Sequence, residues 1–309
     1  MKKTKLLFLS IILLAGCSNE PGEKKDPNQL NVLCPTGAPA VAFTSNLANP
    51  NLKFFSEASD IIALMSNDEA DVAVLPTNAG VQQINKGLKY KLAATITFGN
   101  LFVASTGLDD DGVMDESDYI VSFQQGNVPD KIFKSVYSVD GGLHYVANAQ
   151  EAAKCLKLKK NSADNNANVE YVLLAEPALT TLKAGGAEFT IYSNLQEEYK
   201  NKFNNQQIFQ ASIFVHQDLD HEVAETFLGS VKSNVESILA NPSLLENASQ
   251  IDPEAETHLG IKIAPAVSAI TNQNHLGIGY VDAYSHKGEI DTFLSIFGMN
   301  ATNEEIYFK

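Results

Sequence analysis

Asp71-Val-Ala-Val-Leu-Pro-Thr-Asn-Ala-Gly80 is the stretch on which the predicted fold depends. Residues 72–75 form a short apolar run, which is typical of a parallel strand covered on both faces. Pro76 cannot continue a central strand, and Thr77 and Asn78 then stand where a helix N-cap belongs. Open α/β sheets bind ligands just beyond the carboxyl ends of their strands. We therefore predict ligand contacts at Pro76, Thr77 and Asn78, and the alternative that they only cap the next helix stays open.

The composition limits what the chain can bind. A length of 309 residues is enough for two modest domains. The formal net charge of -15 makes nucleic acid an unexpected partner. All 22 basic residues are Lys, so no guanidinium can clamp a carboxylate or phosphate. A bound anion would have to be held by backbone N–H groups, hydroxyls, amides or Lys.

The first residues predict export and a lipid anchor. Three lysines precede the apolar run of residues 6–14, as in a secretory signal, and this run is too short to span a bilayer comfortably. Leu14-Ala-Gly-Cys17 resembles a bacterial lipobox, which implies cleavage before Cys17 and acyl chains on that cysteine. We expect residues 1–16 to be a signal peptide and residues 17–29 to be a flexible tether.

The pattern of strand, polar loop and helix also occurs before and after the opening stretch. Residues 30–35 predict a strand that ends at a proline, and Thr36, Gly37 and Ala38 then lead into a helix. Gly37 would let a ligand approach the backbone, and exposed N–H groups suit an anion or a carbonyl oxygen. A plain capped turn is the open alternative. Residues 52–56 and 61–65 predict a further strand and helix, so a parallel sheet with right-handed crossovers is expected.

Two long extended runs predict a hinge between two lobes. Residues 90–105 contain a break at Phe98-Gly-Asn100, and residues 207–215 form the return run. A glycine inside a strand marks a bend or a close backbone approach. Phe98 and Asn100 are therefore candidate ligand contacts, and a core role for Phe98 is the open alternative. We expect residues 30–104 and 213–309 in the first lobe and residues 105–212 in the second.

The second lobe repeats the loop pattern. A strand over 119–123 precedes Gly126 and Asn127, and a strand over 169–175 precedes Glu176. Helix N-termini after these loops would face those of the first lobe. Glu176 could accept a hydrogen bond from an N–H or cationic group of a ligand, and a solvated first-turn glutamate is the open alternative.

The sequence offers no pattern for metal or nucleophilic chemistry. The six histidines lack metal-ligand spacing, and no nucleophile elbow, Walker loop or dinucleotide glycine fingerprint occurs. We predict no catalytic residues, no metal and no cofactor, hence a binding protein. Cys34 and Cys155 are expected as free, buried thiols in different halves of the fold.

These features together resemble the type II periplasmic solute-binding proteins of ABC importers. The resemblance is closest to the nitrate/sulfonate/taurine branch, whose fold is shared by thiamine-pyrimidine synthesis proteins. It is carried by 71–78, 91–101, 175–179 and the terminal Glu305-Ile-Tyr-Phe-Lys309. It implies a two-lobed α/β fold with a hinge of two crossing strands, and the loops above as its ligand site.

The resemblance also implies a function. The protein is expected to be a monomeric lipoprotein on the extracytoplasmic face of the membrane, which delivers a small solute to an ABC permease and ATPase. The absence of Arg disfavours amino acids as ligands, whereas an oxyanion-bearing or heteroaromatic solute would fit. A ligand-sensing lipoprotein without transport and a pyrimidine-synthesis-type enzyme of the same fold are the alternatives.

Overall fold

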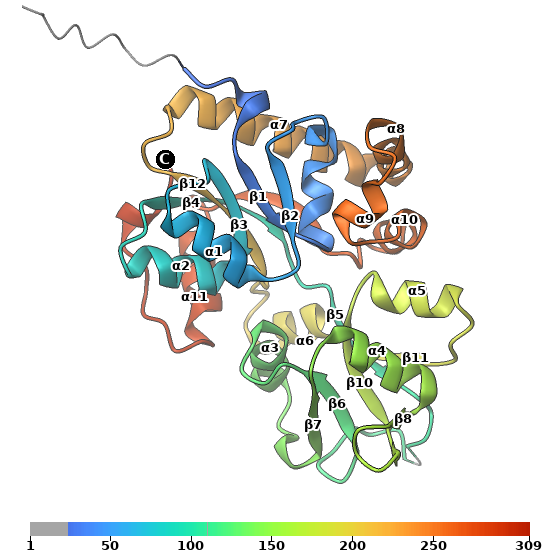
Figure 1. Ribbon diagram of the computed structural model, residues 1–309. Helices are drawn as coiled ribbons and strands as arrows, with labels where there is room; N and C mark the ends of the chain where they lie inside the picture. Colours follow the sequence, from blue (N-terminus) through green and yellow to red (C-terminus); the bar gives the residue numbers. More distant parts are fainter. Residues whose placement is uncertain (1–23, 110) are drawn as a thin grey trace, which may run out of the picture.

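A computed structural model describes residues 24–109 and 111–309 of the chain (Figure 1). The signal peptide, the acylation site Cys17 and most of the tether predicted from sequence lie outside the described residues. Within the described part, no helix is both long enough and apolar enough to cross a membrane.

The chain folds into two α/β lobes, each built on its own sheet (Figure 1). The first sheet has the strand order β13-β4-β12-β3-β1-β2, and the second has the order β11-β5-β10-β6-β7. The strands of the first sheet are β1 (Val32–Pro35), β2 (Leu52–Phe55), β3 (Val72–Pro76), β4 (Tyr90–Thr97), β12 (Ala211–His216) and β13 (Ile278–Asp282). Those of the second are β5 (Leu101–Ser105), β6 (Ile120–Phe123), β7 (Leu143–Val146), β10 (Tyr171–Ala175) and β11 (Thr190–Asn194). A two-stranded ribbon of β8 (Lys160–Asn161) and β9 (Ala167–Asn168) completes the second lobe.

Helices cover both sheets. The α-helices of the first lobe are α1 (Ala58–Ser66), α2 (Thr77–Asn85), α7 (His221–Ala240), α8 (Ala248–Ile251), α9 (Ala255–Leu259), α10 (Ile263–Thr271) and α11 (Lys287–Ser295). Those of the second are α3 (Val128–Val136), α4 (Ala149–Leu158), α5 (Ala178–Ala184) and α6 (Leu195–Lys202). Short 3-10 helices are η1 (Pro27–Gln29), η2 (Ala38–Asn46), η3 (Asp140–Gly142), η4 (Pro242–Asn247) and η5 (Glu304–Ile306). The helix predicted after Gly37 is thus the 3-10 helix η2.

The predicted parallel arrangement of the first three strands is confirmed, since β1 pairs in parallel with both β2 and β3. The other half of the sheet is antiparallel, because β12 runs against β3 and β4, and β13 runs against β4. Three further strands, β7, β11 and β13, are not apparent from the sequence. These strands lie at sheet edges and most of their residues are half-buried or exposed, so they lack a continuous apolar run.

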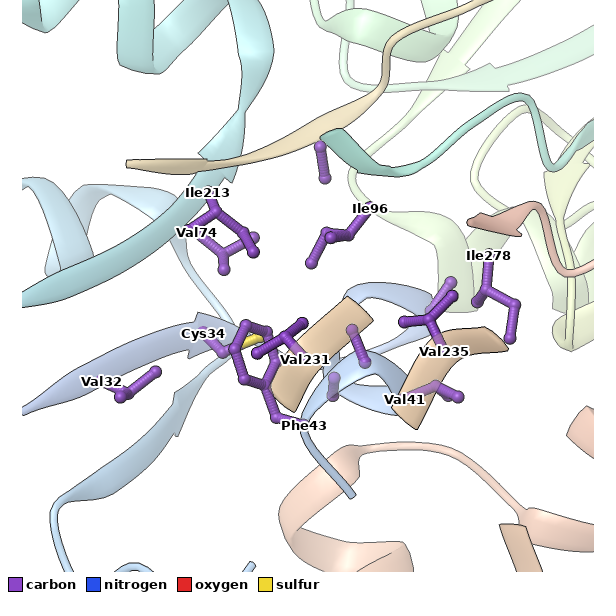
Figure 2. Packing of buried hydrophobic residues seen from close by; sticks show 14 of the residues in the cluster. Val32, Cys34, Val41, Phe43, Val74, Ile96, Ile213, Val231, Val235 and Ile278 are labelled. Carbon is purple, nitrogen blue, oxygen red and sulfur yellow. The ribbon is translucent and has the colours of Figure 1, made fainter. Parts of the chain in front are cut away.

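The largest core lies between the first sheet and helix α7 (Figure 2). Val231 and Val235 of α7 pack there with strand residues such as Cys34, Ile213 and Ile278. The apolar face of α7 includes Val223, Phe227, Val231 and Val235, which are all buried, whereas Leu239 is 38% exposed. Ile238 is buried in its place, because the helical period brings that position to the sheet.

The lobe boundaries differ from those expected. Residues 101–104 are expected in the first lobe, but β5 pairs with β10 and β11 of the second sheet. Ala211 and Ser212 were assigned to the second lobe, but they begin β12 in the first sheet. The chain therefore crosses at residues 98–100 and 206–210, which we call the crossing segments. An apolar run does not reveal which sheet it joins, whereas the break around Gly99 marked the crossing correctly.

Cys34 and Cys155 are free thiols, as expected. Cys34 lies on β1 and Cys155 on α4, in different lobes. Burial raises the pKa of both thiols, so each behaves as a small apolar side chain.

Candidate functional site

Strand register places the predicted loops of both lobes beside the crossing segments. Ala211 of β12 pairs with Pro76 at the end of β3 and with Thr97 at the end of β4. In the second sheet, Ala175 at the end of β10 pairs with Leu101, the first residue of β5. The parallel neighbours β1 and β6 end at the same edges as β3 and β10. The loops that carry the predicted site residues thus lie at one edge of each sheet, formed by the carboxyl ends of β1 and β3 in the first lobe and of β6 and β10 in the second, and this edge faces the other lobe (Figure 1).

The backbone N–H groups of the loop after β1 are hydrogen-bonded within the first lobe. Gly37 adopts φ +100°, which requires glycine, but its N–H donates to Leu259 O at 2.8 Å. The Thr36 N–H donates to Phe55 O at 2.8 Å, and Ala38 is buried. The expectation of exposed N–H groups at Thr36 and Gly37 is therefore wrong.

The Thr36 side chain borders an open cavity of about 700 Å³ between the edge strand β2 and the α8–α9 region. The cavity is lined by Phe54 and Phe55 of β2 and by His258 and Pro253 on the opposite side. Its lining residues all belong to the first lobe. Thr36 is the only predicted site residue that borders it.

Helix α2 begins one residue earlier than expected. Pro76 occupies the N-cap position, and no side chain caps the helix, so the capping interpretation of Thr77 and Asn78 is wrong. Thr77 is fully buried, and its Oγ1 lies 2.7 Å from Ser212 Oγ, which lies 2.8 Å from Thr95 Oγ1. Thr77 thus belongs to a buried hydroxyl chain. Asn78 is half-buried, and its Oδ1 has no partner among the described residues.

The loop after β6 is fixed by an aspartate. Gly126 adopts φ +84°, and its N–H donates to Asp130 Oδ2 at 2.7 Å. Asp130 is buried and also accepts from Tyr145 OH at 2.6 Å. Asn127 is the exposed N-cap residue of α3, and its amide donates to Gln124 Oε1 at 2.6 Å. The Gly126 N–H is therefore not free for a ligand, whereas the Asn127 side chain remains accessible.

Glu176, which follows β10, is hydrogen-bonded to Asn100, which precedes β5. The Glu176 N–H donates to Asn100 O at 2.9 Å, and Asn100 Nδ2 donates to Glu176 O at 3.2 Å. The Glu176 carboxylate accepts from the N–H and hydroxyl of Thr180, both at 2.9 Å. With an exposed fraction of 8%, Glu176 is not the solvated glutamate of the alternative interpretation.

Phe98 packs within the first crossing segment. Its ring meets Phe209 of the other segment edge-on at 5.8 Å between centroids. It also covers Gly279, where a Cβ would lie 2.6 Å from the ring. The Phe98 N–H donates to Gly277 O at 2.7 Å. Phe98 is half-buried, so stacking on a ligand and core packing both stay open.

Four residues beside the crossing segments were missed: Thr97, Gln196, Gln210 and Asn274. Each has a buried side-chain atom without a hydrogen-bond partner among the described residues. Gln196 of α6 also accepts, through Oε1, from the N–H groups of Gly99 at 3.2 Å and Ile208 at 3.1 Å. One side chain therefore joins both crossing segments. Thr97 ends β4 and Gln210 directly precedes β12, so their positions beside predicted extended runs could have marked them as candidates. Only the antiparallel pairing of β4 and β12 shows that the two residues are adjacent.

The same edge carries one histidine. His275, in the loop between α10 and β13, lies 4.9 Å from the Phe102 ring of the second lobe. Burial lowers the pKa of His275, and the nearby Glu176 carboxylate opposes this shift only partly. Neutral imidazole is thus favoured there. No group of three potential metal ligands occurs within residues 24–109 and 111–309.

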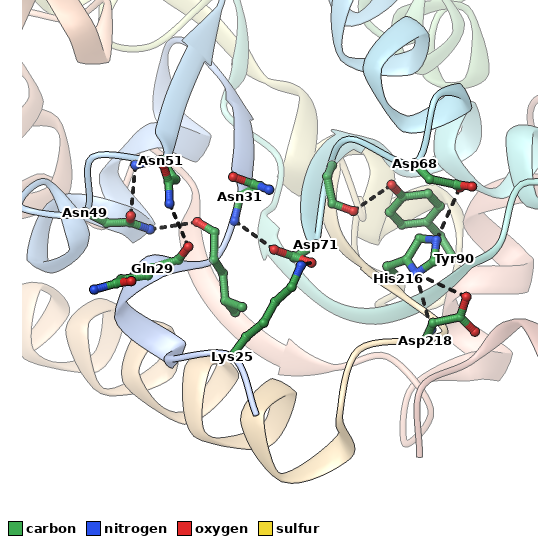
Figure 3. A network of polar contacts seen from close by, with 12 residues as sticks. Lys25, Gln29, Asn31, Asn49, Asn51, Asp68, Asp71, Tyr90, His216 and Asp218 are labelled. Carbon is green, nitrogen blue, oxygen red and sulfur yellow. Dashed lines mark hydrogen bonds and ion pairs between the residues drawn. The ribbon is translucent and has the colours of Figure 1, made fainter. Parts of the chain in front are cut away.

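A second polar cluster lies at the opposite edge of the first sheet (Figure 3). Asp71, just before β3, accepts from Lys25 Nζ at 2.6 Å and from the Asn31 N–H at 3.0 Å. His216 Nε2 lies 3.3 Å from Asp68 Oδ1. These contacts hold the start of the described chain against the amino ends of the strands, away from the predicted site.

Comparisons with known proteins agree with this architecture. No sequence-family model matches the chain, and no curated protein matches it. Several solved structures do. An ABC transporter from Parabacteroides distasonis has a TM-score of 0.72 at 19% identity, over 91% of this chain and 99% of that one. The alkanesulfonate-binding protein SsuA from Xanthomonas axonopodis pv. citri, bound to MOPS, has a TM-score of 0.59 at 11% identity, over 92% and 96%.

A third similar structure has a fold that is stated explicitly. A Candida albicans gene product, described as having the generic periplasmic binding protein structural fold, has a TM-score of 0.51 at 14% identity, over 90% and 92%. The chain has the periplasmic-binding-protein fold. The predicted two-lobed α/β class with two crossing segments is therefore confirmed. At these identities the likeness concerns the fold, and the ligands are those of the named proteins.

Proposed function

We propose that this protein is the solute-binding component of an ABC importer and that its two lobes close on a small solute. The observation that carries the proposal is the strand register, which brings polar loops from both sheets to the two crossing segments. Hinge motion about such segments lets a ligand favour the closed state. Solved structures of the same fold include an ABC transporter and an alkanesulfonate-binding protein, which supports this choice.

The site that we propose for the solute includes Asn78 and Asn127, one from each lobe. Asn78 offers a buried oxygen without a partner, and Asn127 offers an exposed amide. We propose binding rather than catalysis, because the solved structures of this fold include an ABC transporter and an alkanesulfonate-binding protein.

We further propose that acyl chains on Cys17 hold the monomer on the extracytoplasmic face of the membrane. The lipobox-like Leu14-Ala-Gly-Cys17 and the polar tether that follows it support this location. Replacement Cys17→Ser should move the protein from the membrane fraction to the soluble fraction. Retention of the variant in the membrane would argue against the anchor.

A ligand screen tests the binding function. The Cys17→Ser protein is screened by thermal shift against alkanesulfonates, nitrate, pyrimidines and vitamins. A ligand at 100 times its dissociation constant should add roughly 2.7 kcal/mol to the free energy of unfolding. Small-angle X-ray scattering should then show a smaller radius of gyration with the ligand. A complete absence of binding, or binding without compaction, would contradict the proposed lobe closure.

A further inference from the structure

Buried oxygens without hydrogen-bond partners gather beside the crossing segments. Within the described residues, six such side-chain oxygens belong to the crossing segments, to strand ends and loops beside them, or to the first turn of α2. We call this set the acceptor array; it consists of Asn78 Oδ1, Thr97 Oγ1, Asn100 Oδ1, Gln206 Oε1, Gln210 Oε1 and Asn274 Oδ1. A buried acceptor left unpaired is costly, so a set of them needs a common explanation.

Two members of the array have their orientation fixed by backbone partners. Asn100 Nδ2 donates to Glu176 O at 3.2 Å, and Asn274 Nδ2 donates to Ile278 O at 2.6 Å. A carbonyl oxygen can only accept, so the amide nitrogen must face it in both cases. The free atom of each amide is therefore its oxygen.

Asn274 belongs to the first lobe, Asn100 lies in a crossing segment and is bonded to Glu176 of the second lobe, and the two amides flank one glycine. The Gly277 N–H donates to Asn274 O at 2.8 Å, and a Cβ on Gly277 would lie 3.1 Å from Asn100 Cβ. Gly277 also adopts φ +68°, so a side chain is disfavoured there for two reasons. The glycine leaves room for Asn274 and Asn100 to lie close to each other.

Three other members, Gln210, Thr97 and Asn78, join this pair through the first sheet. The Gln210 N–H donates to Thr97 O at 2.9 Å, and Gln210 O accepts from the Thr77 N–H at 3.2 Å, next to Asn78. Thr97 pairs in turn with Ile278 of β13. Thr97 is 1% exposed and Asn100 is 3% exposed, so neither is satisfied by bulk water.

The charges near the array are negative or absent. The Glu176 carboxylate is buried beside Asn100, the chain contains no Arg, and no member of the array is cationic. Among the buried side-chain atoms without a partner in the described residues at this edge, Gln196 Nε2 is a donor, and the Thr97 hydroxyl can donate as well as accept. An oxyanion would bring further acceptors and a negative charge beside these oxygens and the buried Glu176 carboxylate.

We propose, on the basis of the function proposed above, that the acceptor array selects a small neutral or cationic solute carrying several N–H or O–H donors and rejects oxyanions. Each donor of the solute pairs with an oxygen that the protein leaves unpaired. The same oxygens repel the lone pairs of a sulfonate or nitrate, because that ion offers no hydrogen to share.

Ions of matched shape test this selectivity. Guanidinium and nitrate are both planar and trigonal, but the first only donates and the second only accepts; acetamidinium and acetate form a second such pair. Titrations of the Cys17→Ser protein are followed by NMR at constant ionic strength and at concentrations below those that denature. Guanidinium and acetamidinium should shift resonances at the crossing segments saturably, whereas nitrate and acetate should not.

Two threonines of β4 provide matched variants. Thr97→Val removes an unpartnered hydroxyl, so it should weaken guanidinium binding by about tenfold while leaving the protein as stable or more stable. Thr95→Val breaks the hydroxyl chain with Ser212, so it should lower the stability and leave binding unchanged. The opposite pattern, or equal binding by both variants, would overturn the proposal.

The outcomes separate this inference from the proposed function. Saturable binding of nitrate or acetate with compaction of the lobes would preserve a solute-binding function and refute the donor-rich class. Failure of both probe pairs, together with failure of the wider ligand screen, would refute both.

Discussion

Gln196 offers a quantitative test of how the two lobes are joined. Its Oε1 accepts from the N–H groups of Gly99 and Ile208, one on each crossing segment, at 3.2 and 3.1 Å. Gln196 is 9% exposed and Ile208 is fully buried. Gly99 has no room for a side chain, since a Cβ there would lie 2.6 Å from Gln196 Cβ. The two segments are therefore held by one amide in a closely packed environment.

Replacement Gln196→Ala leaves two buried N–H groups without an acceptor. Each such group costs about 1–3 kcal/mol, so the free energy of unfolding should fall by roughly 2–6 kcal/mol. Gln196→Glu keeps an acceptor oxygen at the same position and should lose less. The exposed Gln250→Ala on α8 is the control, with an expected change within about 0.5 kcal/mol.

Urea unfolding followed by circular dichroism gives the free energies, and hydrogen exchange reports on the individual amides. In Gln196→Ala, the amides of Gly99 and Ile208 should lose protection, while the amides within the two sheets keep theirs. If Gln196→Ala matches the control in stability, or if both amides stay as protected as before, the side chain does not join the segments as described.

Two further predictions concern a glycine pair and a histidine. Gly80→Ala should lower the free energy of unfolding by about 1–3 kcal/mol or more, because its Cβ would lie 2.0 Å from the buried Phe214 ring. Gly229→Ala, in open space on α7, should raise the free energy of unfolding by about 0.5–1 kcal/mol. Urea unfolding measures both, and equal effects of the two variants would contradict the packing. Asp252 Oδ2, 2.5 Å from His258 Nδ1, raises the pKa of His258 above 6.5, so its stabilisation is complete below pH 6.5 and is lost as pH rises through the folded-state pKa. An NMR titration should place this pKa above 6.5 in the native protein and nearer 6.5 in Asp252→Asn; identical midpoints would refute the coupling.

Local patterns predicted most of the fold. The apolar runs before Pro35, Pro76 and Glu176 became strands that end at the predicted positions within about a residue. Such runs are informative because a buried strand must be apolar on both faces, and proline or a polar turn must end it. The break at Gly99 likewise marked the crossing between the lobes.

The hydrogen-bond partners of the polar groups could not be predicted in the same way. Thr77 and Gly126 have the residue types of a ligand site, yet Thr77 bonds to Ser212 and Gly126 to Asp130 within their own lobes. Thr97, by contrast, looks like an ordinary strand residue, but its hydroxyl is left without a partner. A hydrogen bond depends on which distant strand supplies the partner, and the local sequence does not contain this information.

By itself, the sequence determined the α/β class, the two crossing segments, the lack of any guanidinium and the lipobox-like leader. These follow from residue type and short-range order along the chain. Only the tertiary structure decided that β5 joins the second sheet and that Gln196 joins both crossings. The tertiary structure also places the residues of the acceptor array beside the crossing segments. The physical reason is that strand pairing and burial are set by contacts between residues far apart in sequence, which decide whether a polar atom is satisfied by the protein or left for a ligand.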